Sequence, residues 1–185
     1  MGDYDGNGTA DLARSWPGPA GSQSYFFHRS VGAPAGSYTT IPWGLSGDKP
    51  AQGDFNGDGE SDFAVFRPST GVWYVMHNGL GTFQYAQFGI STDKIVPADY
   101  DGDGATDIAV YRNGVWYILQ SQSGSVRYES FGLAADVPTP ADYDGDGKAD
   151  VAYSAMERGT DYKALRASRR SSSVRRATTH CPPYL

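Results

Sequence analysis

The sequence lacks several of the features by which enzymes and membrane proteins are usually recognised. Its single cysteine, Cys181, excludes a disulfide within the chain. No apolar run approaches the roughly 20 residues of a membrane-spanning helix, so we expect no membrane insertion. No signal peptide is predicted, because Met1 and Gly2 lead directly into the first repeated motif, and a start inside a motif suggests a fragment.

Basic residues and histidines are also scarce. Residues 1–152 hold 8 Lys and Arg against 19 Asp and Glu, a net charge of −11, whereas residues 153–185 hold 7 against 2, a net charge of +5. This balance argues against nucleic acid as a partner of residues 1–152. His28, His77 and His180 share no motif with a serine or cysteine nucleophile, so we predict a protein that is not an enzyme.

Four copies of one acidic motif, D-x-D-x-D-G-x-x-D, dominate the chain. They begin at Asp3, Asp54, Asp99 and Asp142, and an asparagine replaces one aspartate in each of the first two. Carboxylates at alternate positions of a tight loop point toward a common centre, and Ca²⁺ takes six to eight oxygen ligands in irregular geometry. The glycine at the sixth position permits a sharp bend, and the seventh residue offers its main-chain carbonyl whatever its side chain is. The motif therefore predicts four Ca²⁺ sites.

Other interpretations of these loops fit less well. Asp- and Gly-rich stretches often form plain turns, but four aspartates within nine residues, as in the loops at Asp99 and Asp142, repel one another without a cation. An EF-hand needs glutamate at the twelfth position and flanking helices, and the sequence offers neither. Paired carboxylates also serve glycosidases, but such a pair flanks a cleft, whereas these converge on one loop.

The loops recur at intervals of 51, 45 and 43 residues. Each unit contains four short runs rich in β-branched and aromatic residues, separated by Gly, Ser, Asn and Pro. Residues 115–119 are apolar at consecutive positions, which predicts a strand covered on both faces. We therefore predict an all-β fold of four-stranded antiparallel β-propeller blades, with the propeller incomplete.

The repeats divide the chain into five segments. We assign residues 1–50 to a partial, divergent first blade, 51–93 to the second blade, 94–136 to the third, 137–152 to the start of the fourth, and 153–185 to a tail. Arginine becomes frequent in this tail and the repeated text vanishes.

A shift of reading frame would explain the tail. With suitable codons, residues 156–164 regroup as N-G-T-W-Y-R-L-Q-S, which differs at two places from residues 113–121. Restoring one base before the codon of Tyr153 also lets the junction read D-V-A-V-L-R-N, close to residues 107–113. We therefore expect residues 153–185 to be frameshifted and disordered, the alternative being a natural basic tail.

Trp16, Trp43, Trp73 and Trp116 could stack on a sugar if their rings are exposed at the surface. Trp73 and Trp116 recur at equivalent places in apolar strands, which favours core packing for these two.

The four loops, Phe88-Gly89, Phe131-Gly132 and the segment R-P-S-T-G-V-W-Y at residues 67–74 resemble the FG-GAP/VCBS family of Ca²⁺-binding repeats. Members of this family build β-propellers in integrin α-subunits and in many bacterial secreted and surface proteins. The last segment resembles the bacterial VCBS type. The resemblance covers residues 1–152 and places each loop between the first and second strands of a blade. Family propellers usually have six or seven blades, whereas only two are complete here.

The resemblance also implies which atoms bind Ca²⁺. Side-chain oxygens come from the first, third, fifth and ninth positions, and a carbonyl oxygen comes from the seventh. In chain order these residues are Asp3, Asp5, Asn7, Thr9 and Asp11; Asp54, Asn56, Asp58, Glu60 and Asp62; Asp99, Asp101, Asp103, Ala105 and Asp107; and Asp142, Asp144, Asp146, Lys148 and Asp150. The resemblance implies no catalytic residue and no cofactor other than Ca²⁺.

The function implied by the resemblance is that of a non-catalytic, Ca²⁺-binding segment of a secreted or surface bacterial protein, acting in adhesion or ligand binding. Millimolar extracellular Ca²⁺ suits modest sites of this kind. The alternative is an accessory domain of an extracellular polysaccharide-active hydrolase or lyase whose catalytic domain lies outside this fragment. We expect a protein or carbohydrate partner that the sequence does not identify, and the open blade edges favour self-association.

Overall fold

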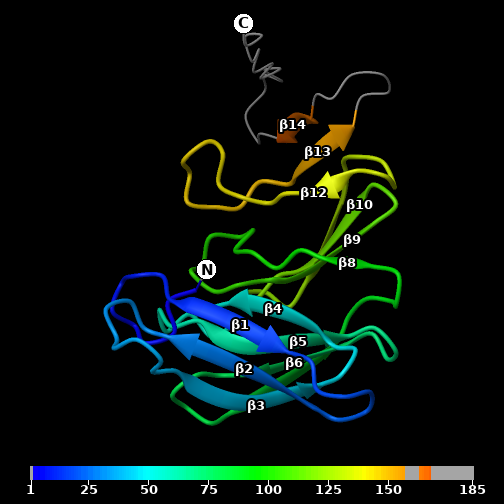
Figure 1. The fold of residues 1–185 in the computed structure, drawn as a ribbon. Coiled ribbons are helices and arrows are strands. Elements are labelled where there is room, and N and C mark those ends of the chain that lie inside the picture. Colours follow the sequence, from blue (N-terminus) through cyan, green and yellow to red (C-terminus); the bar gives the residue numbers. More distant parts are fainter. Residues whose placement is uncertain (1, 157–162, 168–185) are drawn as a thin grey trace, which may run out of the picture.

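The computed structural model describes residues 2–156 and 163–167, and every regular element in them is a β-strand (Figure 1). The described residues include no helix with the length and apolar character of a membrane span. Within the described residues, fourteen strands form four antiparallel sheets, and each sheet is built from strands that follow one another along the chain. The fourth sheet lies at the top of the view, beyond the third (Figure 1).

Two of the sheets have four strands and two have three. The first sheet consists of β1 (Leu12–Trp16), β2 (Gln23–Arg29) and β3 (Thr39–Leu45). The second consists of β4 (Lys49–Gly53), β5 (Asp62–Arg67), β6 (Val72–Met76) and β7 (Phe83–Gln87). The third consists of β8 (Lys94–Ile95), β9 (Ile108–Arg112), β10 (Val115–Leu119) and β11 (Val126–Ser130). The fourth consists of β12 (Val137–Pro138), β13 (Ala152–Met156) and β14 (Lys163–Ala167).

This arrangement confirms the predicted all-β fold. The second and third sheets are four-stranded and antiparallel, as expected of propeller blades, and the sheets formed by the described residues do not close into a barrel. The strands form where β-branched and aromatic residues cluster, and Gly, Ser, Asn and Pro occupy the connections between them.

The apolar cores lie between successive sheets, so each sheet covers a face of the next. Trp73 of the second sheet belongs to the same buried cluster as Val110 of the third. Trp116 of the third sheet belongs to a cluster with Val151, which directly precedes β13 of the fourth sheet. Both tryptophans have 0% of their surface exposed, which confirms the prediction that they pack in the core, whereas Trp16 is 51% exposed.

The strand predicted to be covered on both faces is less buried than expected. In β10, Trp116 and Ile118 are buried, but the alternate residues are only half-buried. One of these, Tyr117, packs edge-to-face on the ring of Tyr128, which is itself 66% exposed on the outer strand β11. It is β9 that is buried on both faces, because neighbouring strands and neighbouring sheets enclose it.

The Phe-Gly pairs end the second and third sheets by capping a buried tryptophan. The indole Nε1 of Trp116 donates a hydrogen bond of 2.9 Å to the carbonyl of Phe131, and Trp73 does the same to Phe88 at 2.8 Å. Gly132, which follows, has a φ of 120°, a conformation that favours glycine. The pair therefore satisfies a buried donor and then turns the chain toward the next sheet.

The tail differs in part from its prediction. Residues 153–185 were expected to be disordered, but Ala152–Met156 and Lys163–Ala167 pair as the antiparallel strands β13 and β14. Strand β13 forms because it continues directly from the fourth acidic loop, and Val151, Ala152 and Tyr153 are buried. Residues 157–162 and 168–185, which include His180 and Cys181, lie outside the described residues.

Candidate metal centres

Each acidic loop after the first lies between the first and second strands of its sheet. Residues 54–62 join β4 to β5, residues 99–107 join β8 to β9, and residues 142–150 join β12 to β13. Residues 3–11 precede β1. This is the placement that the resemblance implies.

Two glycines shape every loop, at the fourth and sixth positions. In the third loop Gly102 has a φ of 80° and Gly104 a φ of 91°, both in the left-handed region. The equivalent glycines of the other three loops are also left-handed. Sequence reasoning identified only the sixth-position glycine, although the spelling D-x-D-G-D-G contains the signal for both.

The first aspartate of a loop accepts hydrogen bonds from these glycines. The Gly102 N–H donates to Asp99 Oδ1 at 2.6 Å, and the Gly104 N–H donates to Asp99 Oδ2 at 2.9 Å. Asp54 and Asp142 accept the same pair of bonds in their own loops. In the first loop, Asp3 Oδ2 accepts from the sixth-position glycine at 2.6 Å. These bonds wrap the main chain around the first carboxylate and lower the pKa of Asp142.

The ninth aspartate anchors the loop to the sheet behind it. Asp107 is fully buried, and its Oδ2 accepts from the Tyr100 N–H at 2.9 Å while its Oδ1 accepts from the Ser121 N–H at 2.7 Å. Asp11 and Asp62 each accept two main-chain bonds in the same way. Sequence reasoning treated this position only as a metal ligand and missed its structural role, because its second partner lies beyond the loop.

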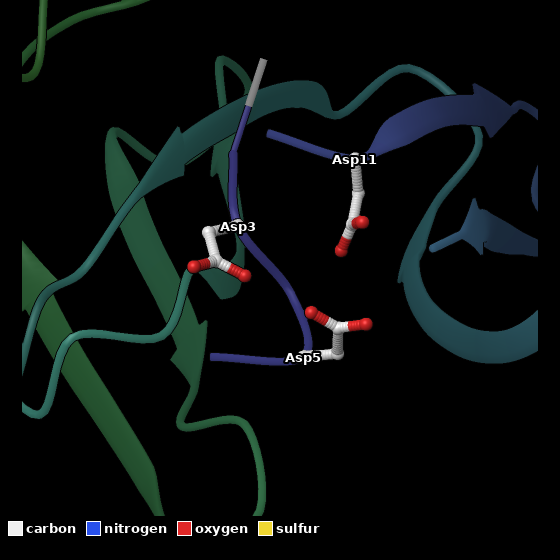
Figure 2. Close-up of side chains that lie close together, drawn as sticks. All are labelled: Asp3, Asp5 and Asp11. Atoms are coloured by element: carbon white, nitrogen blue, oxygen red, sulfur yellow. The ribbon is translucent and has the colours of Figure 1, made fainter. Parts of the chain in front are cut away.

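Three of the four loops gather three carboxylates each, with ligand atoms within 4.8 Å of one another. The groups are Asp3, Asp5 and Asp11; Asp99, Asp101 and Asp107; and Asp142, Asp144 and Asp146. Figure 2 shows the carboxylates of the first group turned toward a shared space. Oxygen donors in this number and spacing suit a hard divalent cation.

The second loop is the exception among the described residues, because Asp54, Asp58 and Asp62 form no such group. Asn56 replaces the third-position aspartate, and its Nδ2 donates to Asp58 Oδ2 at 2.8 Å. The second loop therefore has its side chains bonded to one another where the other loops have converging carboxylates. His77 lies beside it, with Nδ1 3.2 Å from Asp62 Oδ2.

The remaining candidate residues lie in their loops but outside the three carboxylate groups, except that Asp146, at the fifth position, belongs to the group of the fourth loop. Asn7, Asp103 and Asp146, at the fifth position, each accept a hydrogen bond from the N–H of the seventh residue, namely Thr9, Ala105 and Lys148. Asp58 does the same for Glu60. Asp150, at the ninth position, accepts from the Tyr143 N–H at 3.0 Å.

The third loop shows most clearly that these residues fit a cation. Asp101 Oδ2 is buried and has no hydrogen-bond partner among the described residues. Burial, followed by the charges of Asp107 and Asp103, raises the pKa of Asp101, and burial also raises the pKa of Asp107. A buried, unpaired carboxylate oxygen among other carboxylates is costly unless a positive charge balances it.

Taken together, the fold and the loops define an all-β repeat protein with acidic sites that can hold metal ions. A family profile described as FG-GAP-like repeat matches residues 54–110 and again residues 99–153. These matches span more than half of the 185 residues, and the chain belongs to this family. A search of curated proteins and a search of solved structures gave no match.

Proposed function

We propose that the chain is a Ca²⁺-binding, non-catalytic segment of propeller blades from a secreted or surface bacterial protein, acting in adhesion or ligand binding. The observation that carries the proposal is the third loop, where Asp99, Asp101 and Asp107 converge and Asp101 Oδ2 lies buried without a partner. Membership of the FG-GAP-like repeat family supports the extracellular setting.

Calcium suits these loops better than other common ions. The three carboxylate groups contain neither histidine nor cysteine, which zinc prefers. Magnesium demands nearly ideal octahedral geometry, whereas Ca²⁺ accepts irregular sets of six to eight oxygens. In the first and third loops, the aspartates at the first, third and ninth positions would hold the ion, joined by the fifth side chain. In the fourth loop, the aspartates at the first, third and fifth positions would hold it. The carbonyl of the seventh residue would complete each site. The bound ion would neutralise the converging charges and stabilise the loop.

Thermal unfolding with and without Ca²⁺ tests this proposal. At ten times its dissociation constant, one ion adds about 1.4 kcal/mol to the free energy of unfolding, so we expect a higher midpoint in Ca²⁺ than in excess EGTA. Asp101→Ala should reduce the increase. Glu129→Gln, which removes a negative charge from β11 outside the loops, should keep it. Identical midpoints of the wild type in Ca²⁺ and EGTA would refute Ca²⁺ binding.

A carbohydrate is the ligand class that the surface favours. Trp16 is half-exposed and carries the Arg14 guanidinium 4.8 Å from its ring centroid. With Leu12 and Tyr38, it lines a surface hollow of about 440 Å³. Aromatic rings beside a charged donor suit stacking on a sugar. Binding of soluble polysaccharides that is lost in Trp16→Ala would support this ligand, and equal binding by both proteins would contradict it.

Two further aspects of the proposal have their own tests. A hydrolase or lyase domain in the complete reading frame of the gene would favour the accessory-domain alternative over adhesion. Free strand edges, such as that of β1 in the first sheet, can pair with another chain. We therefore expect self-association that rises with concentration in light scattering, and a monomer at all concentrations would oppose it.

A further inference from the structure

Successive acidic loops are joined to one another through their main chains. The Ser61 N–H of the second loop donates to the carbonyl of Asp3 in the first, at 2.6 Å. The same bond recurs from Thr106 to Asp54 at 2.5 Å, and from Ala149 to Asp99 at 2.6 Å. In each case the eighth residue of one loop holds the first residue of the loop before it. The loops therefore lie in series, one against the next.

This contact brings the seventh residue of each loop over the fourth-position glycine of the preceding loop. A Cβ placed on Gly6 would lie 3.0 Å from Glu60 Oε1, and one placed on Gly102 would lie 2.9 Å from Lys148 Cε. The Lys148 Nζ also donates a short hydrogen bond to the carbonyl of Asp101. Between them in the chain, Ala105 occupies the same place over the second loop and carries no charge.

The charge of the seventh residue is opposite in effect to the number of aspartates in the loop that it contacts. The loop with fewer aspartates receives a negative side chain, and a loop with four receives a positive one. The first loop has three aspartates, because Asn7 replaces the fourth, and Glu60 brings a further carboxylate to it. The third loop has four aspartates, and Lys148 brings an ammonium group to it. We propose that the side chain at the seventh position sets the cation affinity of the preceding loop, with Glu60 strengthening the first site and Lys148 weakening the third. This inference rests on the proposed Ca²⁺ binding.

The size of the effect follows from electrostatics in water. A unit charge acting on a divalent ion across about 8 Å changes its binding constant by roughly two- to sixfold, and the smaller figure applies at physiological salt. The seventh residue still offers its own carbonyl to its own loop, and that carbonyl is unaffected by a change of side chain. One residue therefore serves two sites in different ways.

The test is a set of Ca²⁺ titrations on the full chain by isothermal calorimetry. Lys148→Met keeps an unbranched apolar stem and removes the charge, so it should tighten one site about two- to sixfold at low salt. The gain should disappear when Asp101→Ala disables the third loop, and it should persist when Asp144→Ala disables the fourth. Glu60→Gln is the matched variant of opposite sign and should weaken one site by a similar factor.

The outcomes separate this inference from the proposal beneath it. If the wild type does not bind Ca²⁺, the proposed function fails and the inference fails with it. If the wild type binds Ca²⁺ and Lys148→Met leaves every site unchanged, only the inference fails. It also fails if the gain survives Asp101→Ala and disappears in Asp144→Ala, because Lys148 would then act on its own loop. A gain that shrinks as salt is raised supports the electrostatic origin.

Discussion

The third and fourth sheets can be compared at the turn that begins each of them. In the third, Asp93 is fully buried, accepts the Ile90 N–H at 2.8 Å and pairs through both oxygens with Arg112, each at 2.7 Å. In the fourth, Asp136 is likewise buried and accepts the Leu133 N–H at 2.7 Å. The turn is thus the same in both sheets, and the difference lies in the strand that faces it.

The strand register shows what the fourth sheet lacks. Lys94 pairs with Tyr111 in the third sheet, and Val137 pairs with Ser154 in the fourth. The position of Arg112 is therefore taken by Ala155, whose side chain has no donor. The second sheet resembles the third in this respect, because Asp48 forms the equivalent pair with an arginine of β5 at 2.8 and 2.9 Å.

The fourth sheet begins to differ from the third at the point where the sequence stops following the repeat. Restoring one base before the codon of Tyr153 makes the junction D-V-A-V-L-R-N, which places arginine at the position of Ala155. The alternative frame therefore gives the buried Asp136 an arginine partner, as its counterparts Asp48 and Asp93 have in the second and third sheets. The buried Asp136 gives this arginine a structural role, in addition to the match of the junction with residues 107–113, and both support the prediction of a frameshift.

Restoring the reading frame should have the largest effect on stability and should make the fourth sheet most like the third. We expect the corrected fourth sheet to gain both the arginine and a tryptophan-bearing strand, and the midpoint of thermal unfolding to rise because more apolar surface is buried. The nucleotide sequence is the first check. If the codons of residues 153–164 cannot be regrouped into the repeated text, the prediction is wrong.

Removing the tryptophan should make the third sheet resemble the fourth, which has Leu165 at the equivalent register position. Trp116→Ala deletes a fully buried side chain and should lower the free energy of unfolding by about 3–5 kcal/mol in denaturant titrations. Trp116→Leu should cost less. Tyr128→Ala, at an exposed position of β11, is the control and should cost much less, because it removes only the edge-to-face contact with Tyr117. Equal losses for Trp116→Ala and Tyr128→Ala would contradict this account of the core.

Breaking the ion pair should have a smaller effect. Arg112→Ala leaves Asp93 buried without its partner, and we expect a loss of about 2 kcal/mol in the free energy of unfolding, moderated because the arginine is 28% exposed. The double variant Arg112→Ala, Asp93→Asn should recover part of that loss, since the charge is removed. A double variant less stable than Arg112→Ala would show that Asp93 acts through something other than this pair.

Adding an arginine to the fourth sheet should make it resemble the third, with the smallest of these effects on stability. Ala155→Arg offers a donor to Asp136 and should stabilise the chain by about 1 kcal/mol, the ordinary worth of a charge-assisted bond near the surface. Differential scanning calorimetry measures the gain as a higher midpoint. The gain should be absent in an Asp136→Asn background, and its survival there would assign it to packing rather than to the pair.

Much of this architecture could be predicted from the sequence because the repeat is local. The loops, the strands beside them and the core tryptophans are written within a few residues of one another, and the structure places them as expected. The Asp93–Arg112 pair could not be read in this way, since 19 residues separate its members and no short motif joins them. The contact of Lys148 with the third loop was missed for the same reason, being set by the stacking of sheets.

The joins between repeats have a consequence for how such a chain can grow. The Nζ of Lys49 donates to the carbonyl of Asp93, and that of Lys94 donates to the carbonyl of Asp136. In both cases a lysine in the first strand of one sheet binds the turn that begins the next sheet. The main-chain hydrogen bonds between successive loops form a second connection, and the same bond recurs at each junction. Tandem duplication of the DNA for one repeat would therefore create a new junction whose two surfaces already match, which allows lengthening without compensating mutations.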